Sequence, residues 1–261
     1  MKTHGLLSPI GEMVRRVDPD RYLTALFAPP ARREALFTLY AFNHELARAR
    51  EVVREPFAAL IRLQWWREVV EGARRQHEVA GPVGAALDAG WLRPLDLEAM
   101  IAAREMEAEP LETVGDFTAY VMGSAGGVMV AAGHALGWEG AEALRPWGAA
   151  YGVAGILRSV DAHARQGRCL FPLDLMRETG LSEGAAIAAP TAAALEPVRM
   201  SLRTMALGWL QVPVAVPKEA SMAGLPAVLA RRDLRAAGKT GRRAFGDRVA
   251  VVAAGLFRLR L

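Results

Sequence analysis

Cysteine is nearly absent from this chain. Of its 261 residues only Cys169 is a cysteine, which excludes an intramolecular disulfide framework and a cysteine-rich zinc site. A single thiol fits a reducing compartment. The five histidines are dispersed, so a histidine-rich metal site is not expected. The sequence also lacks a glycine-rich phosphate loop with its lysine, an HExxH motif and a nucleophile elbow, so these nucleotide-binding and hydrolase templates do not apply.

Segments that would target or anchor the chain are also scarce. The first 13 residues hold a short apolar stretch interrupted by Pro9, unlike a signal peptide. We therefore expect a cytoplasmic protein, with peripheral attachment at the inner membrane as an open option. Residues 120–138 carry no charged side chain and nearly reach the length of a membrane span. Their five glycines, one serine and one histidine favour a buried helix of a bundle instead.

Strand-like alternation and β-branched residues are sparse, whereas Ala, Leu, Arg and Glu dominate with a helical period. Prolines divide the chain at helix-length intervals. We predict helices beginning at 18–19, 29–30 and 56, further helices over 98–107, 116–136, 141–165, 192–210 and 245–259, and a loop over 211–226. The prediction is one all-α domain. Residues 1–17 are an N-terminal extension, residues 18–210 the helical domain, and residues 211–261 a loop and basic helix that complete it.

Charge is nearly balanced overall but uneven along the chain. The net charge is +4, yet residues 218–261 contain ten Lys and Arg against three Asp and Glu, so this region carries +7 and the remainder −3. Arginines in a partly apolar region suit an anionic membrane surface or an acidic partner. A solvated helix face has the same composition, so that alternative stays open. Nucleic acid is not an expected partner, because no aromatic platform accompanies the basic residues.

Two segments place polar side chains on otherwise apolar helices. Residues 40–51 read YAFNHELARARE, and residues 151–175 read YGVAGILRSVDAHARQGRCLFPLDL. The second begins without charge and then presents Arg158, Asp161, Arg165 and Arg168. These segments are either buried helices that emerge into solvent or a polar mouth over an apolar cavity, as in bundles that bind amphipathic ligands.

With LFAPPARREALFTLYAF, LQWWRE and YVMGSAGGVM, these segments resemble the squalene/phytoene synthases over roughly residues 18–208. The resemblance implies an isoprenoid-synthase helical bundle with a central apolar cavity. Enzymes of this family join two isoprenoid diphosphates head to head, with Mg²⁺ bound by two aspartate-rich motifs. The positions that match the family pattern, and that the resemblance assigns to the fold or to the cavity mouth, are Tyr40, Trp66, Arg67, Gly123, Gly127, Arg158, Arg165, Gly167, Arg168 and Pro172.

The aspartate-rich motifs themselves are not preserved. By this resemblance the first motif's acidic positions fall on Ala47, Arg48 and Glu51, and the second motif's on Ser159 and His163. Only Glu51 keeps a carboxylate, whereas Mg²⁺ requires several carboxylates beside the substrate phosphates. We therefore assign no catalytic residue and no metal or other cofactor, with Mg²⁺ expected only if the chain is an active prenyl transferase.

The same comparison gives the candidate binding residues. Arg48 reverses the charge of an acidic position, so that with Arg158, Arg165 and Arg168 it is expected to meet a phosphate directly. The full candidate set for an isoprenoid diphosphate or another lipid-like ligand is Tyr40, Asn43, His44, Arg48, Glu51, Trp66, Gly123, Gly127, Arg158, Ser159, His163, Arg165 and Arg168.

The stretches AFNHELA, LIRLQWWREVVEG and LFPLDLMRETGLSEG are similar to a non-catalytic branch of the family that serves in assembly of respiratory complex I, the NADH dehydrogenase. This similarity implies an isoprenoid-binding, lipid-binding or scaffold protein whose partners are subunits of the respiratory complex. Two alternatives remain: an active head-to-head prenyl transferase, and a bundle with a collapsed cavity that serves only as an interaction module. We favour the assembly role, because the carboxylates are missing.

Overall fold

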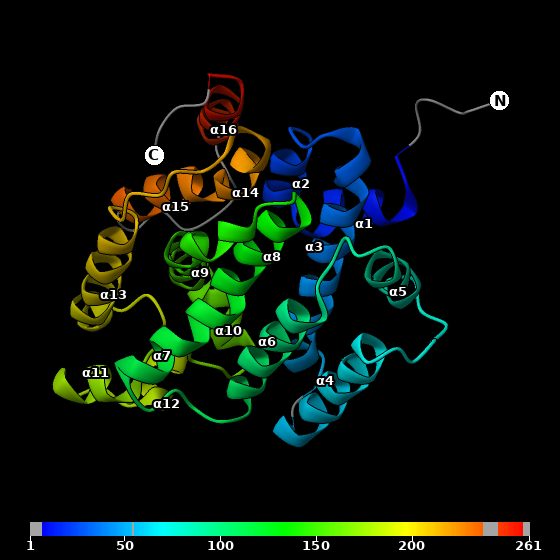
Figure 1. Ribbon diagram of the computed structural model, residues 1–261. Helices are drawn as coiled ribbons and strands as arrows, with labels where there is room; N and C mark the ends of the chain where they lie inside the picture. Colours follow the sequence, from blue (N-terminus) through cyan, green and yellow to red (C-terminus); the bar gives the residue numbers. More distant parts are fainter. Residues whose placement is uncertain (1–6, 54, 237–244, 258–261) are drawn as a thin grey trace.

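The computed structural model describes residues 7–53, 55–236 and 245–257, and within these ranges it contains helices and no β-strand (Figure 1). The predicted all-α fold is confirmed. The α-helices are α1 (Pro9–Val17), α2 (Pro19–Ala25), α3 (Pro30–Glu51), α4 (Pro56–Val70), α5 (Ala80–Asp88), α6 (Pro94–Glu105), α7 (Val114–Val121), α8 (Gly127–Ala135), α9 (Arg145–Arg158), α10 (Val160–Arg165), α11 (Leu173–Glu178), α12 (Glu183–Ala188), α13 (Glu196–Trp209), α14 (Ser221–Gly224), α15 (Pro226–Arg235) and α16 (Phe245–Phe257).

Local sequence signals set many of the helix starts. Helices α2, α3 and α4 each begin at a proline, whose fixed φ suits the first helical position. Asp18 caps α2 by accepting a hydrogen bond from the backbone N–H of Arg21 at 3.0 Å. Ser182 caps α12 in the same way, through the N–H of Ala185 at 3.2 Å. The predicted starts at 18–19, 29–30 and 56 are confirmed.

Two helices predicted as continuous are interrupted, so these predictions were wrong. Between α7 and α8 lies a π-helical turn, Met122–Gly126, in which the Ser124 hydroxyl donates to the carbonyl of Tyr120 at 2.6 Å. The segment 141–165 starts as a 3₁₀ turn and breaks at Ser159, between α9 and α10. The predicted loop 211–226 contains α14, and α15, which was not predicted, follows it directly.

The π turn and α9 pack backbone to backbone. A Cβ at Gly148 would lie 2.7 Å from the carbonyl oxygen of Ala125 and 2.7 Å from the Cα of Gly126. A Cβ at Gly152 would lie 2.7 Å from the Cβ of Ala125. Glycine at these positions lets the backbone of α9 approach the irregular turn closely.

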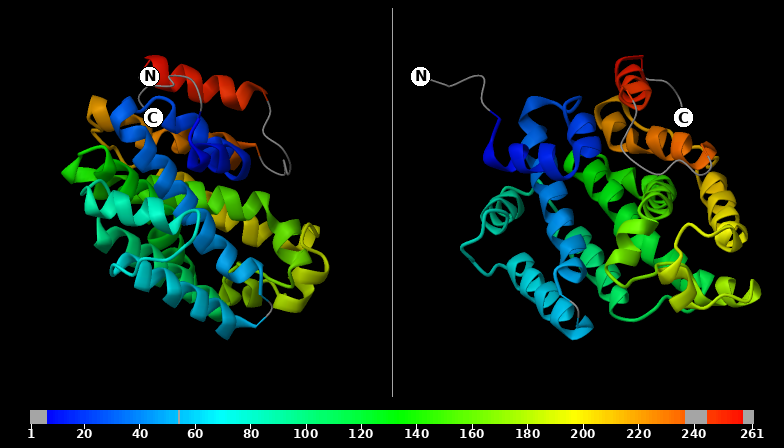
Figure 2. Two further views of the ribbon diagram at one scale, coloured as in Figure 1. Left: turned by 90° about the vertical axis from the view of Figure 1, so that its right-hand side faces the viewer. Right: turned by 180° about the vertical axis from the view of Figure 1, so that it is seen from behind.

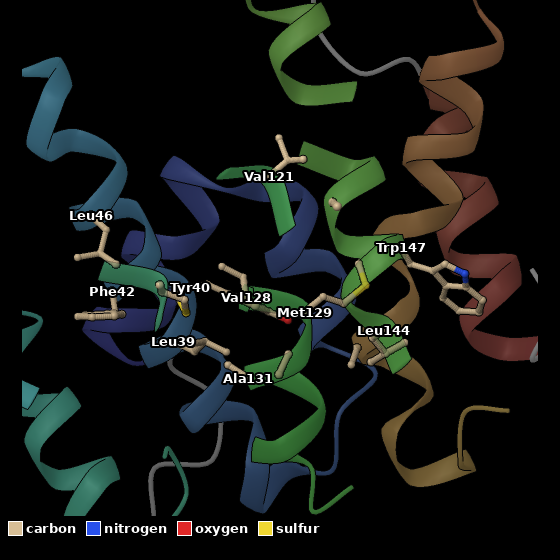
Figure 3. Packing of buried hydrophobic residues seen from close by; sticks show 14 of the residues in the cluster. Leu39, Tyr40, Phe42, Leu46, Val121, Val128, Met129, Ala131, Leu144 and Trp147 are labelled. Atoms are coloured by element: carbon tan, nitrogen blue, oxygen red, sulfur yellow. The ribbon is translucent and has the colours of Figure 1, made fainter. Parts of the chain in front are cut away.

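Helix α8 lies at the centre of the hydrophobic core. Its residues are almost all buried, as predicted for the uncharged segment 120–138. Figure 3 shows Val128 and Met129 between Leu39 of α3 on one side and Leu144 and Trp147 on the other.

The two ends of the described chain pack on the same bundle. Helix α1, in the segment predicted to be an extension, buries Ile10, Met13 and Val14 and contacts α3. Helix α16 contacts α15 and α2 at one edge of the molecule (Figures 1 and 2). In the described ranges no helix combines the length and apolar character needed to cross a bilayer.

Candidate functional site

A cavity of about 290 Å³ opens between α3, α6, α7, α9 and α10. Helix α3 contributes the face that carries the first polar segment, and α9 and α10 contribute the second. The candidate residues that line this cavity are Asn43, His44, Glu51, Ser159, His163 and Arg168. The two polar segments therefore meet at a shared cavity, which these six residues line.

Other candidate residues support the walls without reaching the cavity lining. Tyr40 is buried beneath the guanidinium of Arg21, which lies 5.9 Å from its ring centroid. Trp66 is buried against Phe42, edge to face at 5.4 Å. Gly123 and Gly127 face α6, where added Cβ atoms would lie 2.7 Å from the Cβ of Ala103 and 3.2 Å from Cγ of Met100. These glycines permit close packing against α6, and neither lines the cavity.

The expected group of four arginines is not formed, and of these four only Arg168 lines the cavity. Arg48 lies 3.3 Å from Glu45, one turn earlier on α3, and Arg165 is exposed. Arg158 donates to Asp233 of α15 at 2.8 Å and lines a separate cavity of about 300 Å³. On a helix of about 100° per residue, Arg158 is about 120° from Gly152, which faces the central cavity.

A buried ionic network that the sequence analysis did not identify forms one wall. Glu107 accepts hydrogen bonds from Arg104 at 2.7 Å, from the Tyr120 hydroxyl at 2.8 Å, and from Arg168. Burial by itself would raise the pKa of Glu107, but Arg104 and Arg168 outweigh it and hold that pKa below its ordinary value. The carboxylate is therefore ionised at neutral pH, and both of its oxygens accept hydrogen bonds from side chains of the network.

A second ion pair lies at the junction of α1 and α2. Arg21 donates to Asp18 at 2.8 Å, and its guanidinium lies over the ring of Tyr151, 4.9 Å from the centroid. Burial raises the pKa of Tyr40, which lies beside this pair, to about 12, so the phenol stays neutral. Asp18 and Arg21 both line the cavity and neutralise each other there.

The two histidines that line the cavity carry no charge at neutral pH. Burial, and to a lesser extent Arg168, lowers the pKa of His163 to about 4. Burial also lowers the pKa of His44. Both rings are therefore polar, neutral groups that cannot supply positive charge to an anionic ligand.

Comparison with known proteins identifies the family. The model of the squalene/phytoene synthase family matches residues 14–254. The chain belongs to this family. Among solved structures, a dehydrosqualene synthase bound to a ligand superposes with a TM-score of 0.75 at 15% identity, covering 95% of this chain and 94% of that one. Squalene synthase HpnC from Alicyclobacillus acidocaldarius gives 0.69 at 17% identity, covering 87% of this chain and 92% of that one.

The names of curated relatives of this chain state another role. The chain is 24% identical over 184 residues to human "NADH dehydrogenase (ubiquinone) complex I, assembly factor 6", covering 66% of this chain and 54% of that protein. It is 26% identical over 185 residues to the Drosophila melanogaster homolog, covering 66% of this chain and 55% of that one. The chain thus spans about half the length of the curated relatives that it matches.

The cavity of this squalene/phytoene synthase family member does not fit the magnesium cluster that the fold implies. Its lining carboxylates are Asp18, Glu51 and Glu107. Asp18 and Glu107 accept hydrogen bonds from arginines, which compete with a metal for the same oxygens. Within the described part of the chain, no three His, Cys, Asp or Glu side chains are grouped to hold a metal ion. The donor set is therefore unsuited to a multi-magnesium diphosphate site.

Sequence signals for the missed residues exist but are weak. Arg104 and Glu107 are three residues apart at the end of a helix whose preceding residues, Met100 and Ile101, are buried. Two residues of opposite charge that follow buried residues at this spacing indicate a buried ion pair. The partner Arg168 is 61 residues further along the chain, so only the tertiary fold shows that the network is complete.

Proposed function

We propose that this protein is a non-catalytic member of the squalene/phytoene synthase family that serves in assembly of the NADH dehydrogenase complex. The observation that carries the proposal is the pairing of cavity carboxylates with arginines, at Asp18 with Arg21 and at Glu107 with Arg104 and Arg168. The names of the curated relatives support the assembly role.

The arrangement opposes prenyl transfer for an electrostatic reason. Departure of a diphosphate requires positive charge that stabilises the leaving group. The cavity contains three arginines and three carboxylates, and Glu51 lies close enough to Arg104 to raise its pKa. A bound diphosphate would have to displace these carboxylates, which leaves buried charges without partners. We infer that any isoprenoid or lipid-like ligand of this cavity has a neutral headgroup and binds without metal or other cofactor.

We further propose that the partners are subunits of the respiratory complex and that the protein meets them at the cytoplasmic surface of the inner membrane. The basic C-terminal region supports this placement, because ten Lys and Arg against three Asp and Glu between residues 218 and 261 favour an anionic surface. Contact through this region would be peripheral.

Deletion of the gene tests the proposed function. We expect assembled NADH dehydrogenase complex and NADH oxidation by membranes to fall, and expression of the wild-type chain to restore both. Glu51→Gln, which removes the one carboxylate retained from the first motif, should restore them equally well. Normal complex levels in the deletion strain would contradict the assembly role. Formation of a prenylated product from farnesyl diphosphate and Mg²⁺, abolished by Glu51→Gln, would instead establish a prenyl transferase.

A further inference from the structure

Helix α16 has one face on the protein and an opposite face that is apolar and exposed. On the inner face, Val251 and Ala254 are buried, and α16 contacts α15 and α2. A Cβ at Gly255 would lie 2.7 Å from the ring of Phe27, so this contact is close. One side of α16 therefore packs closely on the rest of the protein, and the helix lies at the edge of the molecule (Figures 1 and 2).

The outer face is a continuous apolar stripe. Phe245 is 83% exposed, Val249 48% and Leu256 63%, and Val252, which is partly buried, completes the series. Their spacing of four, three and four residues places all four within about 60° of arc, at about 100° per residue. Exposure of large apolar side chains to water is unfavourable, and their transfer to an apolar environment lowers the free energy.

Charge identifies the environment that would cover this stripe. Helix α16 carries two charged residues, Asp247 and Arg248. Asp247 accepts a hydrogen bond from Arg232 of α15 at 2.7 Å, whereas Arg248 is exposed beside the stripe. Arg232 and Arg235 are also exposed on the neighbouring helix, within a C-terminal region of net charge +7. An apolar stripe with an exposed arginine beside it, in a region of net positive charge, matches the boundary between anionic headgroups and acyl chains.

We propose that α16 docks flat on an anionic phospholipid membrane, with Phe245, Val249, Val252 and Leu256 inserted below the headgroups and Arg248 among them. The inner face stays on α15 and α2, so the helix lies in the plane of the membrane. This assignment gives residues and an orientation to the membrane contact of the proposed function, on which it rests for its biological setting.

Vesicle binding of the full chain tests the proposal. We expect co-sedimentation with vesicles of 70% phosphatidylcholine and 30% phosphatidylglycerol, weaker binding in high salt, and little binding to pure phosphatidylcholine. Phe245→Ser with Leu256→Ser should weaken binding at least tenfold. The matched control is Phe57→Ser with Leu95→Ser, because Phe57 and Leu95 are 72% and 77% exposed on other helices. Circular dichroism checks that both double variants keep the wild-type helicity.

A local probe provides a second readout. An environment-sensitive dye on Val249→Cys, in a Cys169→Ser background, should shift to the blue on anionic vesicles. Absence of wild-type binding, or equal loss in both double variants, would overturn the proposal. So would a dimer that Phe245→Ser with Leu256→Ser dissociates while vesicle binding is unchanged, because a second copy would then cover the stripe. The assay contains no respiratory subunit, so its outcome is independent of the gene-deletion experiment.

Discussion

At Glu107 a single buried carboxylate accepts hydrogen bonds from Arg104, Tyr120 and Arg168. The network lines the central cavity, and its buried ion pairs also contribute to the stability of the fold. In Glu107→Gln the two arginines lose their counter-charge in a buried setting. Breaking such a pair by removing one partner costs about 3–5 kcal/mol.

We expect the free energy of unfolding of Glu107→Gln, measured by urea titration, to fall by at least about 2 kcal/mol. The control is Glu112→Gln, because Glu112 pairs with Arg177 at an exposed site, where ion pairs contribute at most about 1 kcal/mol. Equal stabilities for the two variants would show that the network does not hold Arg104 and Arg168 as described.

A pH dependence follows from His163. Its ring binds a proton near pH 6.5 when unfolded but only near pH 4 when folded, because burial lowers its pKa. The unfolded chain therefore binds more protons between these values, and the native state loses up to about 3 kcal/mol as the pH falls from 6.5 to 4. Melting curves of His163→Leu should show a weaker decline over this range than wild type, and parallel declines would contradict the assigned burial.

At the scale of helices, the approach of α9 to the π turn depends on glycine. In Gly148→Ala the new Cβ would lie 2.7 Å from backbone atoms of Ala125 and Gly126, which cannot move aside as a flexible side chain can. We expect a loss of about 1–3 kcal/mol in thermal or urea unfolding. Gly208→Ala is the control, because Gly208 is exposed on α13 with open space around it. There alanine should stabilise by up to about 1 kcal/mol.

Helix type and the proline-set starts could be predicted from sequence, because they depend on local conformational preferences. The π turn at Met122–Gly126 and the break at Ser159 could not, since both segments are helical in composition and the interruptions depend on packing. The glycines in residues 120–138 indicated close helix packing, but they did not indicate which helix would pack against this segment. The prolines in residues 211–226 led to the prediction of a loop, so α14, which is only one turn long, was not predicted.

At the scale of the whole molecule, the resemblance placed both polar segments at one cavity, and the structure has Asn43, Glu51 and His163 in the lining of one cavity. Arg158 does not, because its position on α9 turns it toward Asp233 of α15. No local pattern pairs residues 75 positions apart. Likewise, the loss of the motif aspartates is visible in the sequence, whereas the pairing of Asp18 and Glu107 with arginines at the cavity is visible only in the fold.

The central claim is that the family's fold is retained while its metal-diphosphate site is lost. Titration calorimetry with a non-reactive farnesyl thiodiphosphate, with and without Mg²⁺, tests it most directly. We predict weak or undetectable binding that Mg²⁺ strengthens by less than about twofold, because two of the three cavity carboxylates, Asp18 and Glu107, are paired with arginines. An affinity that increases tenfold or more with Mg²⁺ would contradict the account and show that a metal site survives.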